Sequence, residues 1–136
     1  MTLAKGSLMP RPAVLATYSE GDRVYSAISL IDSGADMSAM DSKIAETLNL
    51  DLTGPKTKSY GIDGTIETVI SSTTVTIQNE SEKHIIPIPV RVLFMKEGSP
   101  ICSTLLGRKG FFDKFLISID EYNQHLVLEP NETLEN

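Results

Sequence analysis

Cysteine, tryptophan and histidine are scarce in this sequence. The scarcity of cysteine and histidine limits the disulfides and metal sites that the chain can form. The 136 residues include one cysteine, Cys102, two histidines and no tryptophan. One cysteine cannot close a disulfide within the chain, so we expect a reducing compartment, the cytoplasm, with Cys102 as a small buried side chain. His84 and His125 lie far apart, and neither has neighbours at metal-ligand spacing, so we predict no metal and no cofactor.

Long apolar runs and basic clusters are also missing. No stretch is long enough to span a bilayer, and no apolar segment follows Lys5 near the N-terminus, so we expect no membrane partner and no secretory signal. The net charge is −6, and Arg108-Lys109 is the only adjacent basic pair, which argues against a nucleic-acid partner. Hydrophobic residues make up 40% of the chain and charged residues 22%, the balance of a folded domain.

The length allows one domain with a core of its own and is too short for two ordinary domains. We predict this domain at 12–130. A flexible N-terminal arm, 1–11, precedes it, and a polar C-terminal tail, 131–136, follows it.

Most of the domain shows the short alternating patterns of β-strands, joined by turn residues. The predicted strands are 12–19, 23–31, 57–60, 65–78, 84–94, 104–106, 116–120 and 126–129. Pro87 and Pro89 stand two apart in one of them, which indicates an edge without strand partners. Two segments differ: 41–50 has apolar residues at helical spacing behind a capping Asp41 or Ser42, and 110–115 predicts one or two helical turns. An all-β domain follows, closed as a barrel or folded as a sandwich.

The most informative stretch is Asp32-Ser33-Gly34-Ala35, which comes directly after an apolar strand. An acid at a strand end can lie at the base of a cleft, and Gly34 lets a second carboxylate come close. The hydroxyl of Ser33 can brace the loop. Alone, Asp-Ser-Gly is expected by chance at about one position in a few thousand and also forms ordinary turns, so its weight depends on context.

In that context the stretch resembles the active-site motif of retropepsin-like aspartic peptidases, which is a hydrophobic run followed by Asp-Ser/Thr-Gly-Ala. Gly61-Ile62-Asp63-Gly64 is similar to the tip of the family's flap hairpin. Leu105-Leu106-Gly107-Arg108 is similar to its hydrophobic-hydrophobic-Gly-Arg motif, with a short helical segment after it. The resemblance covers roughly 12–129. The helix at 41–50 is closer to the DNA-damage-inducible shuttle proteins and bacterial relatives than to minimal viral enzymes.

The resemblance implies a closed acid-protease barrel with one or two short helices and an active site shared by two copies. It also implies roles for particular residues. These are Asp32 as catalytic acid; Ser33, Gly34 and Ala35 as active-site loop; Asp36, Tyr60, Gly61, Ile62, Asp63 and Gly64 as substrate contacts; and Gly107 and Arg108 as structural support. In the family an ion pair lies near the active site, and we expect Asp36 to pair with Arg108.

The sequence holds only one copy of the catalytic motif, and this predicts a homodimer. Aspartic peptidases activate water between two carboxylates that share a proton. The other acids near the C-terminus, Asp120 and Glu121, are not followed by Ser/Thr-Gly, so we expect two Asp32 side chains to meet at a two-fold axis and to cleave a peptide or protein substrate.

Two alternatives stay open. One is a non-catalytic peptide-binding or dimerisation module with the same fold; the intact Asp32 favours the enzyme, and the unusual Asp63 at the flap tip favours the module. The other is an unrelated β-barrel in which Asp32 is a turn residue, which the Leu-Leu-Gly-Arg segment argues against.

Overall fold

Strands dominate the computed structural model of the chain, which describes all residues except 5, 9–10, 62–63, 96–103 and 132–136. The strands are β1 (Thr2–Ala4), β2 (Gly6–Leu8), β3 (Arg11–Glu20), β4 (Arg23–Ile31), β5 (Ser38–Asp41), β6 (Thr57–Gly61), β7 (Gly64–Gln78), β8 (Lys83–Phe94), β9 (Thr104–Leu106), β10 (Phe115–Asp120) and β11 (His125–Pro130). The helices are α1 (Ser42–Thr47) and the short 3₁₀ helix η1 (Phe112–Lys114). The prediction of an all-β domain with one or two short helices is therefore confirmed.

Six strands close into a barrel. β3 pairs with β4, β4 with β9, β9 with β5, β5 with β8 and β8 with β7, and β7 returns to β3 through Thr74–Thr76. The β4–β9 and β5–β8 pairs are parallel, and the other pairs of the ring are antiparallel. Closure leaves the ring without free strand edges at its seam, which stabilises a sheet of short strands.

The predicted β3–β4 hairpin forms with the register that its alternation requires. Val14, Ala16 and Tyr18 are buried and belong to the core, whereas Leu15 between them is 62% exposed. Leu15 lies opposite Ile28 on the outer face. Side chains two apart along a strand share a face, so this alternation fixes which side of the ribbon faces the core.

The helix α1 is shorter than the predicted segment 41–50. Asp41 caps it, because its carboxylate accepts a hydrogen bond from the backbone N–H of Lys43 at 3.1 Å. The chain leaves the helix at Asn49, whose φ of 58° is left-handed. None of the described helices has the length and apolar character needed to span a bilayer.

The proline-containing strand β8 has the expected unpaired stretch. Pro87 and Pro89 lie opposite Thr74 and Ser72 of β7. On its other edge β8 pairs with β5 only over Val90–Leu93. Among the described residues, the edge beside the prolines has no strand partner, because proline has no N–H to donate there.

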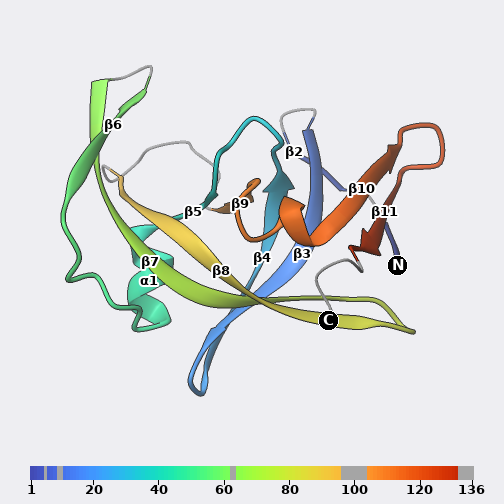
Figure 1. The fold of residues 1–136 in the computed structure, drawn as a ribbon, viewed down its shortest axis with the longest axis horizontal. Helices are drawn as coiled ribbons and strands as arrows, with labels where there is room; N and C mark the ends of the chain where they lie inside the picture. Colours follow the sequence, from blue (N-terminus) through green and yellow to red (C-terminus); the bar gives the residue numbers. More distant parts are fainter. Residues whose placement is uncertain (5, 9–10, 62–63, 96–103, 132–136) are drawn as a thin grey trace.

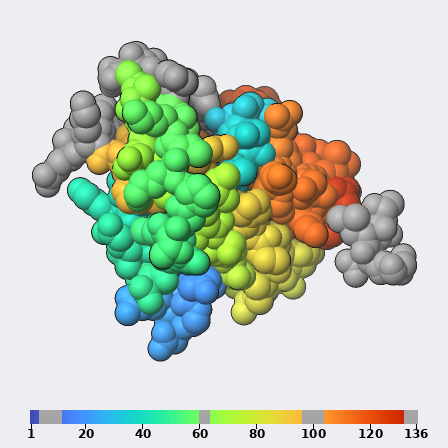
Figure 2. All heavy atoms as spheres, turned by 60° about the vertical axis from the view of Figure 1, so that its left-hand side comes forward, coloured from blue at the N-terminus to red at the C-terminus, as the bar shows by residue number. Residues whose placement is uncertain are grey.

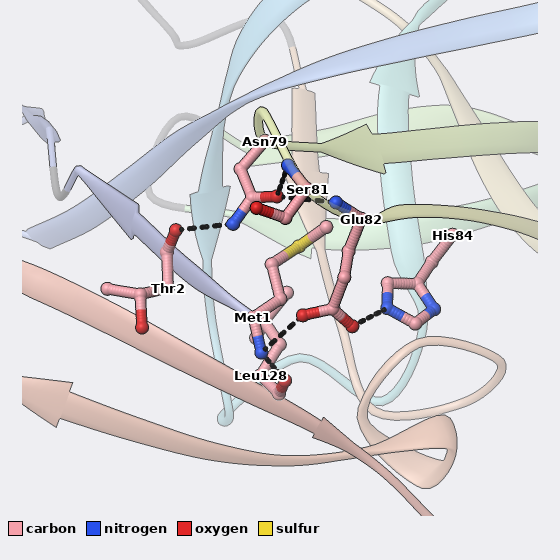
Figure 3. Close-up of polar contacts among 7 residues, drawn as sticks. All are labelled: Met1, Thr2, Asn79, Ser81, Glu82, His84 and Leu128. Atoms are coloured by element: carbon pink, nitrogen blue, oxygen red, sulfur yellow. Dashed lines mark hydrogen bonds and ion pairs between the residues drawn. The ribbon is translucent and has the colours of Figure 1, made fainter.

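The first residues do not form the loose arm that we expected. β1 pairs with β11 and, with β10, forms a three-stranded sheet, while β2 pairs with β3. Figure 3 shows a second set of contacts at the start of β1: the Met1 ammonium lies 2.9 Å from the Leu128 carbonyl oxygen and 3.3 Å from the Glu82 carboxylate. The side-chain amide of Asn79 also donates to the Thr2 carbonyl at 3.1 Å. The sequence did not reveal these partners, since they lie more than 75 positions away.

Candidate active site

Asp32 stands directly after β4, at one end of the barrel. Its backbone N–H donates to the Leu106 carbonyl at 3.0 Å and so continues the parallel β4–β9 pairing by one residue. The side chain is half-buried, and its Oδ1 accepts a hydrogen bond from the Gly34 N–H at 2.9 Å. The Ala35 N–H donates to the Asp32 carbonyl at 3.2 Å and closes the turn. The carboxylate is therefore held by the backbone of its own loop.

Gly34 is the residue that gives this carboxylate its place. A Cβ at Gly34 would lie 3.2 Å from the Asp32 Oδ1 atom, which is tighter than ordinary van der Waals contact. Ser33, which we expected to brace the loop, is exposed, and its hydroxyl makes no hydrogen bond within the described part of the chain. The loop is instead braced by the Gly34 N–H.

A second segment supports the loop from the side. The backbone N–H groups of Arg108 and Lys109 donate to the carbonyls of Ala35 and Asp36, each at 2.9 Å. The Gly107 N–H donates to the buried Ser38 hydroxyl at 3.1 Å. The two chain segments 35–38 and 107–109 thus lie side by side, although about 70 positions separate them in the sequence.

Gly107 sits where only a glycine fits. A Cβ there would lie 2.4 Å from the Met37 carbonyl oxygen and 3.0 Å from the Ala35 carbonyl oxygen. Both neighbours are backbone atoms and cannot rotate away, so Gly107 is what allows the close approach of the two segments.

The ion partner of Asp36 differs from the expected one. Its carboxylate lies 3.5 Å from the guanidinium of Arg91 on β8, and among the described residues it forms no ion pair with Arg108. Val90 and Val92 on either side of Arg91 are buried, so the Arg91 side chain points outward. β8 pairs with β5 at this point, Ala39 opposite Arg91, and this pairing brings Arg91 next to the loop. No sequence pattern connected Arg91 on β8 with Asp36.

The hairpin that the sequence predicted around 61–64 forms between β6 and β7. Its register places Tyr60 opposite Thr65 and Gly61 opposite Gly64, which adopts a φ of 109° that favours glycine. The other two predicted flap residues, Ile62 and Asp63, lie outside the described residues. In Figures 1 and 2 the described ends of β6 and β7 at this hairpin (green) and the loop that follows β4 (cyan) both lie at the upper side of the molecule.

A charged cavity opens beside the loop. It has a volume of about 460 Å³ and is lined by Asp36, Met37, Arg108, Lys109 and Asp113. Two of these residues belong to the segment after Asp32 and three to the segment after β9, so the hydrogen bonds between the segments fix its walls. The described residues contain no group of three or more His, Cys, Asp or Glu side chains that could hold a metal ion.

Three buried hydroxyl groups form a network between strands that no sequence pattern connected. The Ser29 hydroxyl lies 2.7 Å from the Tyr18 hydroxyl and 2.7 Å from the Thr104 hydroxyl. All three residues are at most 1% exposed. The network joins β3, β4 and β9, the strands on which Asp32 and Gly107 depend.

Comparisons with known proteins agree with this geometry. No protein-family model matches the sequence, and no curated protein matches it either. Among solved structures, a retropepsin-like aspartic protease from Rickettsia conorii superposes with a TM-score of 0.63 and 18% identity, covering 94% of this chain and 88% of that one. The retroviral protease-like domain of Ddi1 from Leishmania major superposes with a TM-score of 0.56 and 16% identity, covering 93% and 98%.

The closed six-stranded barrel and these superpositions define the class: the chain has the retropepsin-like fold. At these identities the likeness concerns the fold, and the predicted fold is confirmed. Both similar structures are a retropepsin-like or a retroviral protease-like domain, in agreement with the predicted resemblance to retropepsin-like proteins.

Proposed function

We propose that the chain is an aspartic endopeptidase that acts as a homodimer, with Asp32 of each copy as the catalytic pair. One observation carries the proposal: within a retropepsin-like fold, the single Asp-Ser-Gly-Ala loop holds the Asp32 carboxylate by the Gly34 N–H at a strand end. The same type of hydrogen bond closes an ordinary turn at Asp51 and Thr53, so the support comes from where the motif lies: at the end of the parallel β4–β9 pair in a retropepsin-like fold. The cytoplasmic location and the absence of a cofactor remain predictions from the sequence.

The reaction follows from two carboxylates that share one proton. Carboxylates about 3 Å apart cannot both ionise, so one is charged and the other protonated. The charged one takes a proton from a water molecule, whose oxygen attacks the carbonyl carbon of the peptide, and the protonated one gives its proton to the carbonyl oxygen. In the collapse of the tetrahedral intermediate a proton passes to the amide nitrogen, the C–N bond breaks, and an acid and an amine leave.

The second carboxylate has to come from a second copy. The chain has a single Asp-Ser-Gly motif. Ser33 and Gly34 are exposed, and Asp32 is half-buried, so the loop offers a surface to a two-fold partner.

The flap and Asp36 complete the proposed substrate site. We assign the backbone of Tyr60, Gly61 and Gly64 to cover the substrate, since these residues pair in a hairpin on the same side as the loop. Ile62 and Asp63 are assigned the same role from the sequence alone. Asp36 follows the loop and is 69% exposed, which leaves its carboxylate open to a substrate backbone N–H despite its contact with Arg91.

Cleavage of an unstructured protein tests the proposal. The wild-type chain is incubated with casein-like substrate between about pH 4 and about pH 7, where a shared-proton pair is active. Asp32→Asn keeps the shape and removes the charge, so we expect the fragments to disappear. Asp22→Asn in the exposed β3–β4 turn is the matched control and should cleave like wild type.

The result separates the two candidate functions. Equal cleavage by wild type and Asp32→Asn would mean that a contaminant cuts the substrate and would end the proposal. If neither protein cleaves but both bind peptides and dimerise in sedimentation, the chain is the non-catalytic binding or dimerisation module.

A further inference from the structure

We propose that the charged cavity selects an acidic side chain of the substrate, within about four residues of the cut bond. The inference rests on the proposed function, because it names a substrate feature for the same site. Two observations support it. Arg108 and Lys109 place two positive charges on the cavity wall, and the carboxylates of Asp36 and Asp113 contact other groups.

Each of the two carboxylates of the cavity already has a contact with a group other than Arg108 or Lys109. Asp36 lies 3.5 Å from the Arg91 guanidinium, and an Asp113 oxygen accepts a hydrogen bond from the Gly110 N–H at 3.1 Å. Among the described residues, neither Arg108 nor Lys109 forms an ion pair. The cavity therefore presents two cations without an anion of their own, and a carboxylate is the group that they are best suited to bind.

The backbone fixes these cations with respect to the catalytic loop. Arg108 and Lys109 donate their N–H groups to Ala35 and Asp36 at 2.9 Å, and Gly107 is locked behind them against Met37. Asp36 follows Asp32 by four positions, so their Cα atoms are at most about 14 Å apart. An extended peptide advances about 3.3 Å per residue, so a substrate lying over Asp32 has a side chain near the cavity within about four residues of its cut bond.

The volume of the cavity and the net charge of the chain both indicate that the preference for an acid is confined to particular positions of the substrate peptide. A volume of about 460 Å³ is large enough for one long side chain and lies in the range of about 300–1,000 Å³ of pockets that hold small ligands. The chain as a whole carries a net charge of −6, so it offers no general attraction to acidic peptides. The two-fold dimer has two copies of the cavity, so a glutamate should help at one position on each side of the cut bond and not at all positions.

A position scan with matched peptides tests the inference. A cleavable peptide is made with Glu or Gln at each of the four positions on either side of the cut bond, and kcat/KM is measured. We expect Glu to be favoured about fivefold to tenfold at one position on each side of the cut bond, the scale of a partly exposed charge-assisted contact. Lys109→Gln should remove most of this preference, and Lys109→Glu should reverse it toward Lys.

Lys114→Gln is the matched control, because Lys114 lies in the same segment but lines a different cavity. It should keep the wild-type preference. An unchanged preference in Lys109→Gln, a Glu effect spread evenly over all positions, or a change in dimerisation alone would overturn the inference.

A binding experiment separates this inference from the proposed function. The Asp32→Asn chain is titrated with labelled Glu and Gln peptides, and affinity is read by fluorescence anisotropy with and without Lys109→Gln. Glu-selective binding that depends on Lys109 supports the cavity even if no peptide is ever cut. Equal binding of both peptides, or no binding, overturns it, whereas absent cleavage by wild type counts against the proposed function alone.

Discussion

At the scale of single residues, two glycines govern the geometry of the proposed catalytic site. Gly107 permits the approach of two backbone segments, and Gly34 leaves room for the Asp32 carboxylate. The sequence motifs pointed to both residues. What they do became visible only with the distances, since a missing Cβ matters through the atoms that would meet it.

Gly34→Ala should impair catalysis more than stability. The new methyl group would lie 3.2 Å from the Asp32 Oδ1 atom and would push the carboxylate from its place. Gly34 has no positive φ, so the backbone itself accepts alanine. Because small misplacements of a reacting group are costly, we expect kcat/KM to fall by roughly 10- to 100-fold, while thermal unfolding changes little.

Gly54→Ala is the matched control for this substitution, because its new Cβ would make only ordinary contact at 3.6 Å with the Ile70 carbonyl oxygen. It should retain activity. A Gly34→Ala protein with wild-type kcat/KM would show that the Asp32 carboxylate tolerates displacement, and the role given to Gly34 would be wrong.

At the scale of the elements, the buried hydroxyl network holds three strands together under the loop. Thr104→Val keeps the shape of the side chain but leaves the Ser29 hydroxyl with one partner fewer. The Ser29 hydroxyl keeps its contact with Tyr18, so the variant loses one hydrogen bond, worth about 0.5–1.5 kcal/mol, and the free energy of unfolding in urea should fall by that amount. Ser29→Ala should cost a similar amount, and the double variant less than the sum, because both changes break the same network.

Thr17→Val on the same hairpin is the control. Thr17 also shares a hydroxyl contact, 2.9 Å from Ser26, but this pair is exposed to water. Its loss should change stability by no more than about 0.5 kcal/mol. Equal effects of Thr104→Val and Thr17→Val would mean that burial gives the network no special weight.

Elements formed by neighbouring residues were those that the sequence predicted best. The β3–β4 and β10–β11 hairpins follow from alternation on both sides of a turn, and Asp41 marked the helix start. Pairings between distant short strands were not predictable, because two or three residues carry too little pattern. The parallel pair Leu30–Leu105 and the ion pair Asp36–Arg91 are of this kind, and both bear on the site.

At the scale of the whole molecule, one cluster connects the three-stranded sheet to the barrel. The Met1 ammonium, on the strand that flanks β11, lies 3.3 Å from Glu82 in the β7–β8 turn, and the other Glu82 oxygen lies 3.3 Å from the His84 ring (Figure 3). The hydrogen bond with the Met1 ammonium, and next that with His84, lowers the pKa of the Glu82 carboxyl below its ordinary value. This contact makes the attachment of β1 depend on the charge of one exposed acid.

The pH dependence of unfolding should reveal this connection in a chain that begins at Met1 with a free amine. Because the pKa of Glu82 is lower in the folded chain, the unfolded chain binds the proton more readily, and acid favours unfolding. The stabilising contribution is present above the ordinary pKa of 4.5 and is lost as the pH falls through the lower folded value. The urea midpoint of wild type should therefore drop more steeply below about pH 5 than that of Glu82→Gln. Glu80→Gln is the control, because it makes the same change two residues away in the same turn, and it should keep the wild-type slope. A Glu82→Gln profile parallel to that of wild type would show that the Met1 contact contributes nothing to holding the sheet on the barrel.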